Sequence, residues 1–588
     1  MFFIAVTKSG LKDKFQNMTV EEIQVNSLAA TIVTDHLLSK YITDINSFSI
    51  IESPLKASDN FKDVIFTEVS YDKANNTLSI YKAAISGRPI YYHINSMGEF
   101  FCSTHISMLR NAGVRIEENT DVLPEFFIYR YVMPPNTMYR NIKQLSFGSR
   151  LKVKLEDKSC KIVNIEQYAP PLPDRCITDI SDASNHVLDL LTQSIQDLEV
   201  CKKQIAVLLS GGIDSSILTS ICKRKFSIDE SYSTGYPFEK PELNIEKQYA
   251  LSAAKEFGMN HHYYESNNND YLLGFLEAIS LAEEPLHHLQ SVCLHLLFKN
   301  GIQNGKTIII QGLGAGGLFG NFRNFLYQKN KNLYRVSSVR TIKTAFEIVS
   351  KLTGRGKKFL NTLNLCTSKA DLSDPKNLLW SWHCYGSKEW VCDHFNITLE
   401  DVIKEQYRTI QRFEKESIYN IWSMYSLLGD EDVTLSIWNK IGEGNGKIIF
   451  SPFYELEILN YVFSMSWKLK LKKPENILRK EIARKSGIPE FIIDRPKAGF
   501  GLMRKDWSCR GGIFEPIVPL ASKVFEEKQI RLMQSSEPNQ AMTFWNILNY
   551  AIWKRLCIND EPLINLLDEL KEGFCKKSPI KKNSIWTS

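Results

Sequence analysis

The sequence predicts an α/β protein with an α+β N-terminal part, built as at least two domains, because 588 residues exceed what one hydrophobic core holds. Three observations predict this class. The apolar run Ile205–Leu209 breaks into a glycine turn and then a helix-like pattern, which is typical of a buried parallel strand followed by a helix. A second apolar run, Thr307–Ile310, also opens into glycines. The first 170 or so residues instead alternate like antiparallel strands.

Composition narrows the classes of protein that the chain could belong to. Hydrophobic residues make up 43% and charged residues 23%, both ordinary for a globular protein, and the net charge of +6 does not call for nucleic acid. Twelve cysteines occur without a C-x-x-C pair, which favours free thiols in a reducing compartment. The apolar start at residues 1–6 is too short for a signal peptide, and no run approaches the ~18 residues that span a membrane. We therefore expect a cytoplasmic protein without a nucleic-acid or membrane partner.

The N-terminal part contains three segments that alternate or run apolar between turn signals: Asp63–Tyr71, Thr77–Ala84 and Pro89–Ile94. The stretch Pro170–Asp174 is a proline-rich linker and marks the predicted boundary. Residues 180–200 then have the pattern of an amphipathic helix that leads into the strand at Ile205. The predicted domains are residues 1–170 and 171–575, followed by a basic tail at 576–588.

The glycine turn, S-G-G-I-D-S-S at Ser210–Ser216, predicts a phosphate site. Gly211 and Gly212 allow positive φ and a close approach of backbone N–H groups to a ligand. The two serines lie at a helix start, where the helix dipole favours an anion. Asp214 places beside it a carboxylate that suits a Mg²⁺ ion bridging phosphates. The alternative is an ordinary strand-to-helix turn with an N-cap serine. The G-x-x-x-x-G-K-S/T phosphate loop is absent.

These motifs resemble a known family. The S-G-G-I-D-S-S string resembles the pyrophosphate loop of N-type ATP pyrophosphatases, which cleave ATP between the α and β phosphates and adenylate a substrate. The run Glu125–Leu151 is similar to the end of the glutaminase domain of asparagine synthetase B and its relatives, and Gln311–Gly320 resembles that family's S-G-x-G-x-D-E-x-F-G-G loop. The resemblance covers nearly the whole chain. It implies a glutaminase-like αββα domain and an ATP-pyrophosphatase domain with a helical extension.

The resemblance also implies site residues, with ATP and Mg²⁺ as cofactors. Lys497, in the segment Pro489–Phe500, would stabilise charge during adenylation and amide formation, with Arg495 as a second catalytic candidate. Asp214 would hold the metal. The residues expected around the nucleotide are Leu208, Ser210, Gly211, Gly212, Asp214, Ser215, Ser216, Thr234, Gln311, Gly312 and Gly314.

Two departures from the family pattern bear on function. Glutamine-using members carry a nucleophilic cysteine after the initiator Met, whereas this sequence has Phe2 and no cysteine before Cys102. We infer a retained fold without glutaminase activity. In the second glycine loop the family's carboxylate or tyrosine positions fall on Leu313, Gly316 and Gly317. Either another carboxylate substitutes, or turnover is low, or the site is degenerate.

Histidine and cysteine groups suggest a metal only weakly. Adjacent histidines on a strand point to opposite faces, which argues against a shared metal at His261-His262, and the same caution covers His287-His288. The spacing of His383, Cys384, Cys392 and His394 is not that of a zinc site.

The favoured function is an AMP-forming carbon–nitrogen ligase that adenylates a carboxylate and closes an intramolecular amide. The basic, aromatic stretch at residues 321–400 favours a peptide substrate, as in the lasso-peptide cyclases of antibiotic biosynthesis, which act with a leader peptidase and a leader-binding protein. The alternative interpretation of this stretch is a charged, solvated surface without a binding role. The alternatives in function are a β-lactam synthetase-like or asparagine synthetase-like ligase, a tRNA-modifying ATP pyrophosphatase, and a non-catalytic scaffold.

Overall fold

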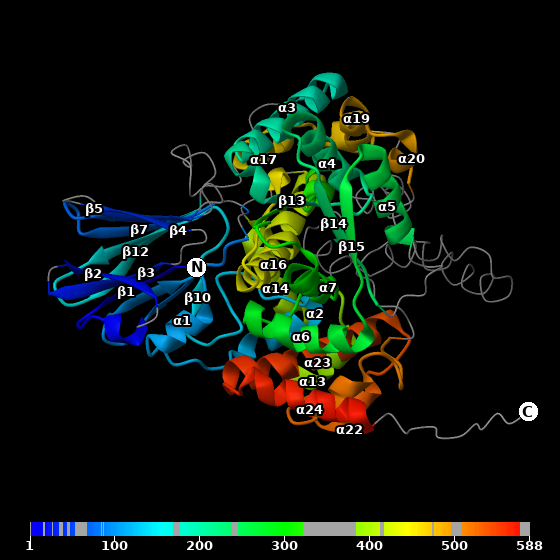
Figure 1. Ribbon diagram of the computed structural model, residues 1–588. Coiled ribbons are helices and arrows are strands. Elements are labelled where there is room, and N and C mark those ends of the chain that lie inside the picture. Colours follow the sequence, from blue (N-terminus) through cyan, green and yellow to red (C-terminus); the bar gives the residue numbers. More distant parts are fainter. Residues whose placement is uncertain are drawn as a thin grey trace, which may run out of the picture.

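The structure is a computed structural model. It describes residues 2–15, 18–25, 27–34, 39–43, 47–52, 67–83, 85, 87–167, 177–237, 245–320, 384–411, 417–472, 476–495 and 507–576. A pair of sheets at the N-terminus lies beside a larger region of helices around a parallel sheet (Figure 1). Lys497, the linker, most of the basic stretch and nearly all of the tail lie outside the described residues.

The N-terminal domain is a sandwich of two antiparallel six-stranded sheets. The first has the order β10-β8-β9-β1-β3-β2 and consists of β1 (Phe2–Thr7), β2 (Thr19–Val25), β3 (Leu28–Thr34), β8 (Tyr91–Ile94), β9 (Phe100–Ser103) and β10 (Lys143–Gln144). The second has the order β12-β11-β7-β6-β5-β4 and consists of β4 (Ser39–Thr43), β5 (Ser47–Glu52), β6 (Thr67–Asp72), β7 (Thr77–Lys82), β11 (Ser149–Leu155) and β12 (Cys160–Gln167).

Alternation along the strands builds the core of this sandwich. Ile4, Ile80 and Leu151 are among the residues buried between the two sheets. Phe3 points the other way and packs against Phe15 of η1 (Lys12–Phe15), with the ring centroids 4.9 Å apart. Also in this part of the chain are α1 (Ile106–Asn111), η3 (Thr120–Val122) and α2 (Leu123–Tyr129). The two predicted strands at 77–84 and 89–94 are confirmed as β7 and β8, and residues 67–71 of the third lie in β6.

The C-terminal domain is organised around a parallel sheet with the strand order β15-β14-β13-β16-β17. Its strands are β13 (Ile205–Leu208), β14 (Glu230–Thr234), β15 (Asn260–Tyr264), β16 (Ile308–Ile310) and β17 (Ile448–Phe450). The chain builds β14 and β15 on one side of β13 and then β16 and β17 on the other. The order therefore reverses between β13 and β16, where α/β proteins bind ligands at the carboxyl ends of their strands.

Helices surround this sheet, and the predicted amphipathic helix at 180–200 is confirmed as α3. The helices before residue 320 are α3 (Ile180–Gln196), η4 (Glu199–Gln204), α4 (Ile213–Phe226), α5 (Ile245–Phe257), α6 (Asn268–Ala282), α7 (Gln290–Leu296), η6 (Leu297–Gly301) and α8 (Ala315–Leu318).

The described C-terminal part is mostly helical, as predicted. Its helices are α13 (Lys388–Phe395), α14 (Leu399–Ile410), α15 (Ile418–Tyr425), η8 (Ser426–Glu431), α16 (Asp432–Gly444), η9 (Pro452–Tyr454), α17 (Leu456–Phe463), α18 (Trp467–Lys470), α19 (Ile477–Lys485), α20 (Glu490–Ile493), η10 (Glu515–Ile517), α21 (Val518–Ala521), α22 (Glu527–Leu532), α23 (Pro538–Trp553), η11 (Lys554–Ile558) and α24 (Leu563–Lys576). Within the described ranges, no helix combines the length and the apolar character that a membrane span needs.

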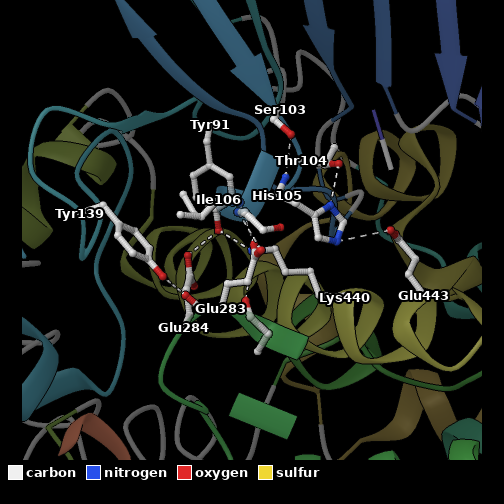
Figure 2. Close-up of polar contacts among 12 residues, drawn as sticks. Tyr91, Ser103, Thr104, His105, Ile106, Tyr139, Glu283, Glu284, Lys440 and Glu443 are labelled. Atoms are coloured by element: carbon white, nitrogen blue, oxygen red, sulfur yellow. Dashed lines mark hydrogen bonds and ion pairs between the residues drawn. The ribbon is translucent and has the colours of Figure 1, made fainter. Parts of the chain in front are cut away.

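A buried polar network joins the two domains (Figure 2). Glu283, after α6, accepts hydrogen bonds from the N–H groups of Ile106 at 2.7 Å and Ser107 at 2.9 Å, at the start of α1. Lys440 of α16 lies 3.2 Å from the same carboxylate and donates to the Tyr91 hydroxyl at 3.1 Å. Burial would raise the pKa of Glu283, but Lys440 and the hydrogen bonds hold that pKa at about 2. The N-terminal domain is therefore fixed to the parallel-sheet domain by a charged contact that water does not screen.

Candidate active site

The first glycine loop has the geometry expected of a phosphate-binding turn. It joins β13 to α4 at the point where the strand order reverses. Gly211 has a φ of 70°. A Cβ at Gly211 would lie 2.4 Å from the Tyr249 carbonyl carbon on α5, so no larger residue fits without moving a helix. The Ser215 hydroxyl accepts from the Ser210 N–H at 3.3 Å, which closes the loop on the start of α4.

The polar side chains of this loop are incompletely paired. The Asp214 Oδ2 lies 3.2 Å from Nη1 of Arg479 on α19, while its Oδ1 is buried and has no hydrogen-bond partner among the described residues. The Ser216 hydroxyl is likewise buried without a partner in the described part of the chain. Buried oxygens of this kind normally have a hydrogen-bond partner, which here would be a bound ligand. A carboxylate and hydroxyls at a helix start are the donor set that a Mg²⁺–phosphate group needs, so the residues fit MgATP.

Arg495 hydrogen-bonds to the backbone of the first glycine loop. It donates from Nη1 to the Ser210 carbonyl at 2.9 Å and pairs through Nη2 with Glu246 at 2.5 Å. Its guanidinium also lies 4.5 Å from the ring centroid of Tyr249. Only 6% of the Arg495 side chain is exposed. This geometry gives Arg495 a role in positioning the loop. Its partner in the prediction, Lys497, lies outside the described residues.

The second glycine loop follows β16 and lies directly against the first. A Cβ at Gly312 would be 2.9 Å from the Ser215 nitrogen, so only glycine lets the two loops approach this closely. Gly314 has a φ of 106°, and its Cβ would meet the Tyr454 ring at 2.6 Å. The Ser451 hydroxyl donates to the Leu313 carbonyl at 2.6 Å and fixes the loop backbone. Gln311 is 4% exposed. The structure therefore brings together the two loops that the sequence predicted.

The residues expected to contact adenine lie on the neighbouring strands. Leu208 ends β13 and Thr234 ends β14, and these two strands pair in parallel. Both residues are partly exposed. Their backbones lie at the same carboxyl edge of the sheet as the glycine loops, which is where the base of a bound nucleotide would need to be.

One group of three possible metal ligands meets among the described residues: His287, His288 and Asp430, with ligand atoms within 4.8 Å of one another. The strand argument against a histidine pair was wrong here, because His287 and His288 lie in the turn after α6 and both face Asp430. Arg130 nevertheless places Nη2 3.5 Å from His288 Nδ1, and a guanidinium there repels a second cation. By contrast, His261 contacts two serines and His262 pairs with Glu230.

Sequence reasoning missed several residues of the site. Arg479, Glu246 and Tyr249 contact the first loop from α19 and α5. Glu431 lies against the second loop from η8. A charged residue on a helix has no local pattern that shows which loop it will reach.

Two abutting glycine loops at the switch point of a parallel sheet, with an acidic and hydroxyl-rich helix start, define a nucleotide-binding α/β protein. Comparison with known proteins gives its family. The family model for asparagine synthase matches residues 186–536, more than half of the chain, and a glutamine amidotransferase domain model matches residues 60–167. The chain belongs to the asparagine synthase family, whose members are ATP-dependent ligases that form amides.

Similar curated proteins are asparagine synthetases. Asparagine synthetase (glutamine-hydrolyzing) 1 of Bacillus subtilis (strain 168) is 20% identical over 518 residues, which covers 84% of this chain and 78% of that protein. A putative asparagine synthetase (glutamine-hydrolyzing) of Mycobacterium bovis is 20% identical over 70% of this chain and 62% of its own length. Asparagine synthetase (glutamine-hydrolyzing) 3 of Bacillus subtilis is 20% identical over 74% of this chain and 67% of that protein.

Proposed function

We propose that the protein adenylates a carboxylate with ATP, releases pyrophosphate, and lets an amine attack the acyl-adenylate to give an amide and AMP. In this scheme the first glycine loop binds the phosphates, and Asp214 and Ser216 use their unpaired oxygens toward Mg²⁺ and phosphate. Mg²⁺ would supply positive charge on the pyrophosphate leaving group. Lys497 would stabilise negative charge on the reacting phosphate and carbonyl oxygens.

We further propose that the nitrogen does not come from glutamine. The observation that carries this step is the lack of an accessible thiol in the described part of the N-terminal domain. Phe2 is 0% exposed, and Ser103 and Thr104 hold its backbone. Cys102 is fully buried, and burial raises the pKa of Cys160 to about 12, whereas a nucleophilic cysteine needs an exposed thiolate.

Without glutamine as the nitrogen source, we take the nucleophile to be an amine of the substrate itself. With an internal amine as the nucleophile, the reaction closes a ring, and a precursor peptide whose N-terminal amine attacks an Asp or Glu side chain is the favoured substrate. A leader peptidase and a leader-binding protein are the partners that such a cyclase implies.

The test is ATP–pyrophosphate exchange with a precursor peptide that carries an internal Asp or Glu. Exchange that depends on the peptide supports the cyclase. Exchange with free aspartate and none with peptides would instead establish the second candidate, an asparagine synthetase-like ligase for small molecules. That candidate is favoured by the match to asparagine synthetases along most of the chain. A protein that binds neither ATP nor Mg²⁺ would be a scaffold.

A further inference from the structure

The second glycine loop, Gln311–Gly320, contains no acidic residue of its own. Two of the positions where its family has carboxylates are Gly316 and Gly317, and the surroundings of these two glycines differ. A Cβ at Gly316 would have nothing within 4 Å, whereas a Cβ at Gly317 would lie 2.8 Å from Oε1 of Glu431. A carboxylate from another helix therefore already occupies the space in which a side chain at position 317 would begin.

The helix that carries Glu431 places this residue next to the second glycine loop. Helices α15, η8 and α16 are continuous, and η8 is a π-helical turn, a feature that is frequent at functional sites. Three successive acidic residues at the junction of η8 and α16 contact three different partners. Asp430 contacts His287, Glu431 contacts the glycine loop, and Asp432 pairs with Lys82 of the N-terminal domain at 3.0 Å. The middle acid, Glu431, is the one that lies nearest to a Cβ built at Gly317.

A hydrogen bond fixes the orientation of this carboxylate. The Tyr454 hydroxyl donates to Glu431 Oε2 at 2.6 Å, so Oε1 is the oxygen that lies against Gly317. The Tyr454 ring in turn presses against Gly314 of the same loop. Glu431 and Tyr454 thus occupy the space that side chains at positions 317 and 314 would otherwise fill.

We propose, on the basis of the function proposed above, that Glu431 replaces the missing carboxylate of the second glycine loop and takes part in holding the Mg²⁺ of MgATP. Carboxylate oxygen is the ligand that Mg²⁺ prefers, and the two loops abut at Gly312 and Ser215. The ion would then be shared between Asp214 on the first loop and Glu431 beside the second. The glycine at 317 would be a consequence of this exchange, because Glu431 Oε1 takes the space of its side chain.

The test is calorimetric titration of ATP into the full-length protein, in excess MgCl₂ and separately in EDTA. Glu431→Gln keeps the size of the side chain and an acceptor for Tyr454 but removes the charge. We expect it to weaken binding of ATP by about 10- to 100-fold in MgCl₂ and to leave binding in EDTA unchanged. The matched control is Glu457→Gln, the same substitution at an exposed position of α17, which should bind like the unaltered protein.

Two further variants keep the test decisive if Glu431→Gln folds poorly. Gly317→Ala would push the carboxylate aside and should weaken binding only in MgCl₂, whereas Gly316→Ala meets open space and should not. Gly316→Asp in the Glu431→Gln protein should restore much of the Mg²⁺-dependent affinity. If Glu431→Gln and Gly317→Ala bind MgATP like their controls, the inference is wrong while the proposed function stands. If the unaltered protein does not bind MgATP at all, the proposed function fails first.

Discussion

Neutralising Glu283 should loosen the junction between the two domains. Glu283 is 8% exposed, and its pKa lies at about 2 against a usual value of 4.5. The depressed pKa means that its charge stabilises the folded state fully above pH 4.5 and progressively less as the pH falls toward 2. At about 1.4 kcal/mol per pH unit, this interval corresponds to about 3 kcal/mol. Glu283→Gln also leaves Lys440 buried without its charged partner, a loss of about 3–5 kcal/mol in comparable cases.

Urea unfolding followed by tryptophan fluorescence measures this effect. At pH 7 we expect Glu283→Gln to unfold at a clearly lower urea concentration, with a loss of about 3 kcal/mol in the free energy of unfolding. The difference between variant and unaltered protein should shrink as the pH falls below 4.5. Glu256→Gln, at an exposed position of α5, is the control and should leave unfolding unchanged. An equal midpoint for Glu283→Gln and the control at pH 7 would refute the reasoning, as would a difference that does not change with pH.

Three further predictions concern the site and its surroundings. Gly312→Ala should lower ATP affinity by about tenfold, because its Cβ would lie 2.9 Å from the Ser215 nitrogen. Calorimetry measures this, with Gly573→Ala, which meets open space on α24, as the control. Arg495→Lys keeps the charge but cannot contact both Ser210 and Glu246, so ATP binding should weaken about tenfold; equal affinity would remove the positioning role. Burial raises the pKa of Glu455 to about 8, so the folded state loses stability as the pH rises from 4.5 to 8. Glu455→Gln should therefore stabilise the protein at pH 8 by at most about 5 kcal/mol and have little effect at pH 4.5, which thermal melting at the two pH values checks.

Sequence patterns predicted the parts of the site that depend on neighbouring residues. The strand at Ile205, the glycine turn and the following helix lie next to one another in the chain, so periodicity and glycine placement were sufficient. The contacts of Arg479 with Asp214 and of Glu431 with Gly317 join segments more than one hundred residues apart. No local pattern encodes such pairs. The rule for adjacent histidines on a strand does not apply to His287 and His288, because they lie in a turn.

For the second loop, the sequence left a substituting carboxylate as one of three alternatives and did not indicate which residue would supply it. Asp430, Glu431 and Asp432 are indistinguishable as a run of acids. Only the course of the π-helical turn separates them, because each successive residue leaves the helix in a different direction. The predicted linker and Lys497 lie outside the described residues, so the boundary at residue 170 and the lysine's role stay predictions.

The measurement that tests the central claim most directly is the fate of ATP in the presence of peptides that carry an N-terminal amine and an internal Asp or Glu. Anion-exchange chromatography of the products should show AMP and pyrophosphate in equal amounts, and mass spectrometry should show a peptide lighter by one water. The Asp214→Ala protein should form neither AMP nor pyrophosphate. Release of ADP and phosphate, or undiminished turnover by Asp214→Ala, would contradict the account.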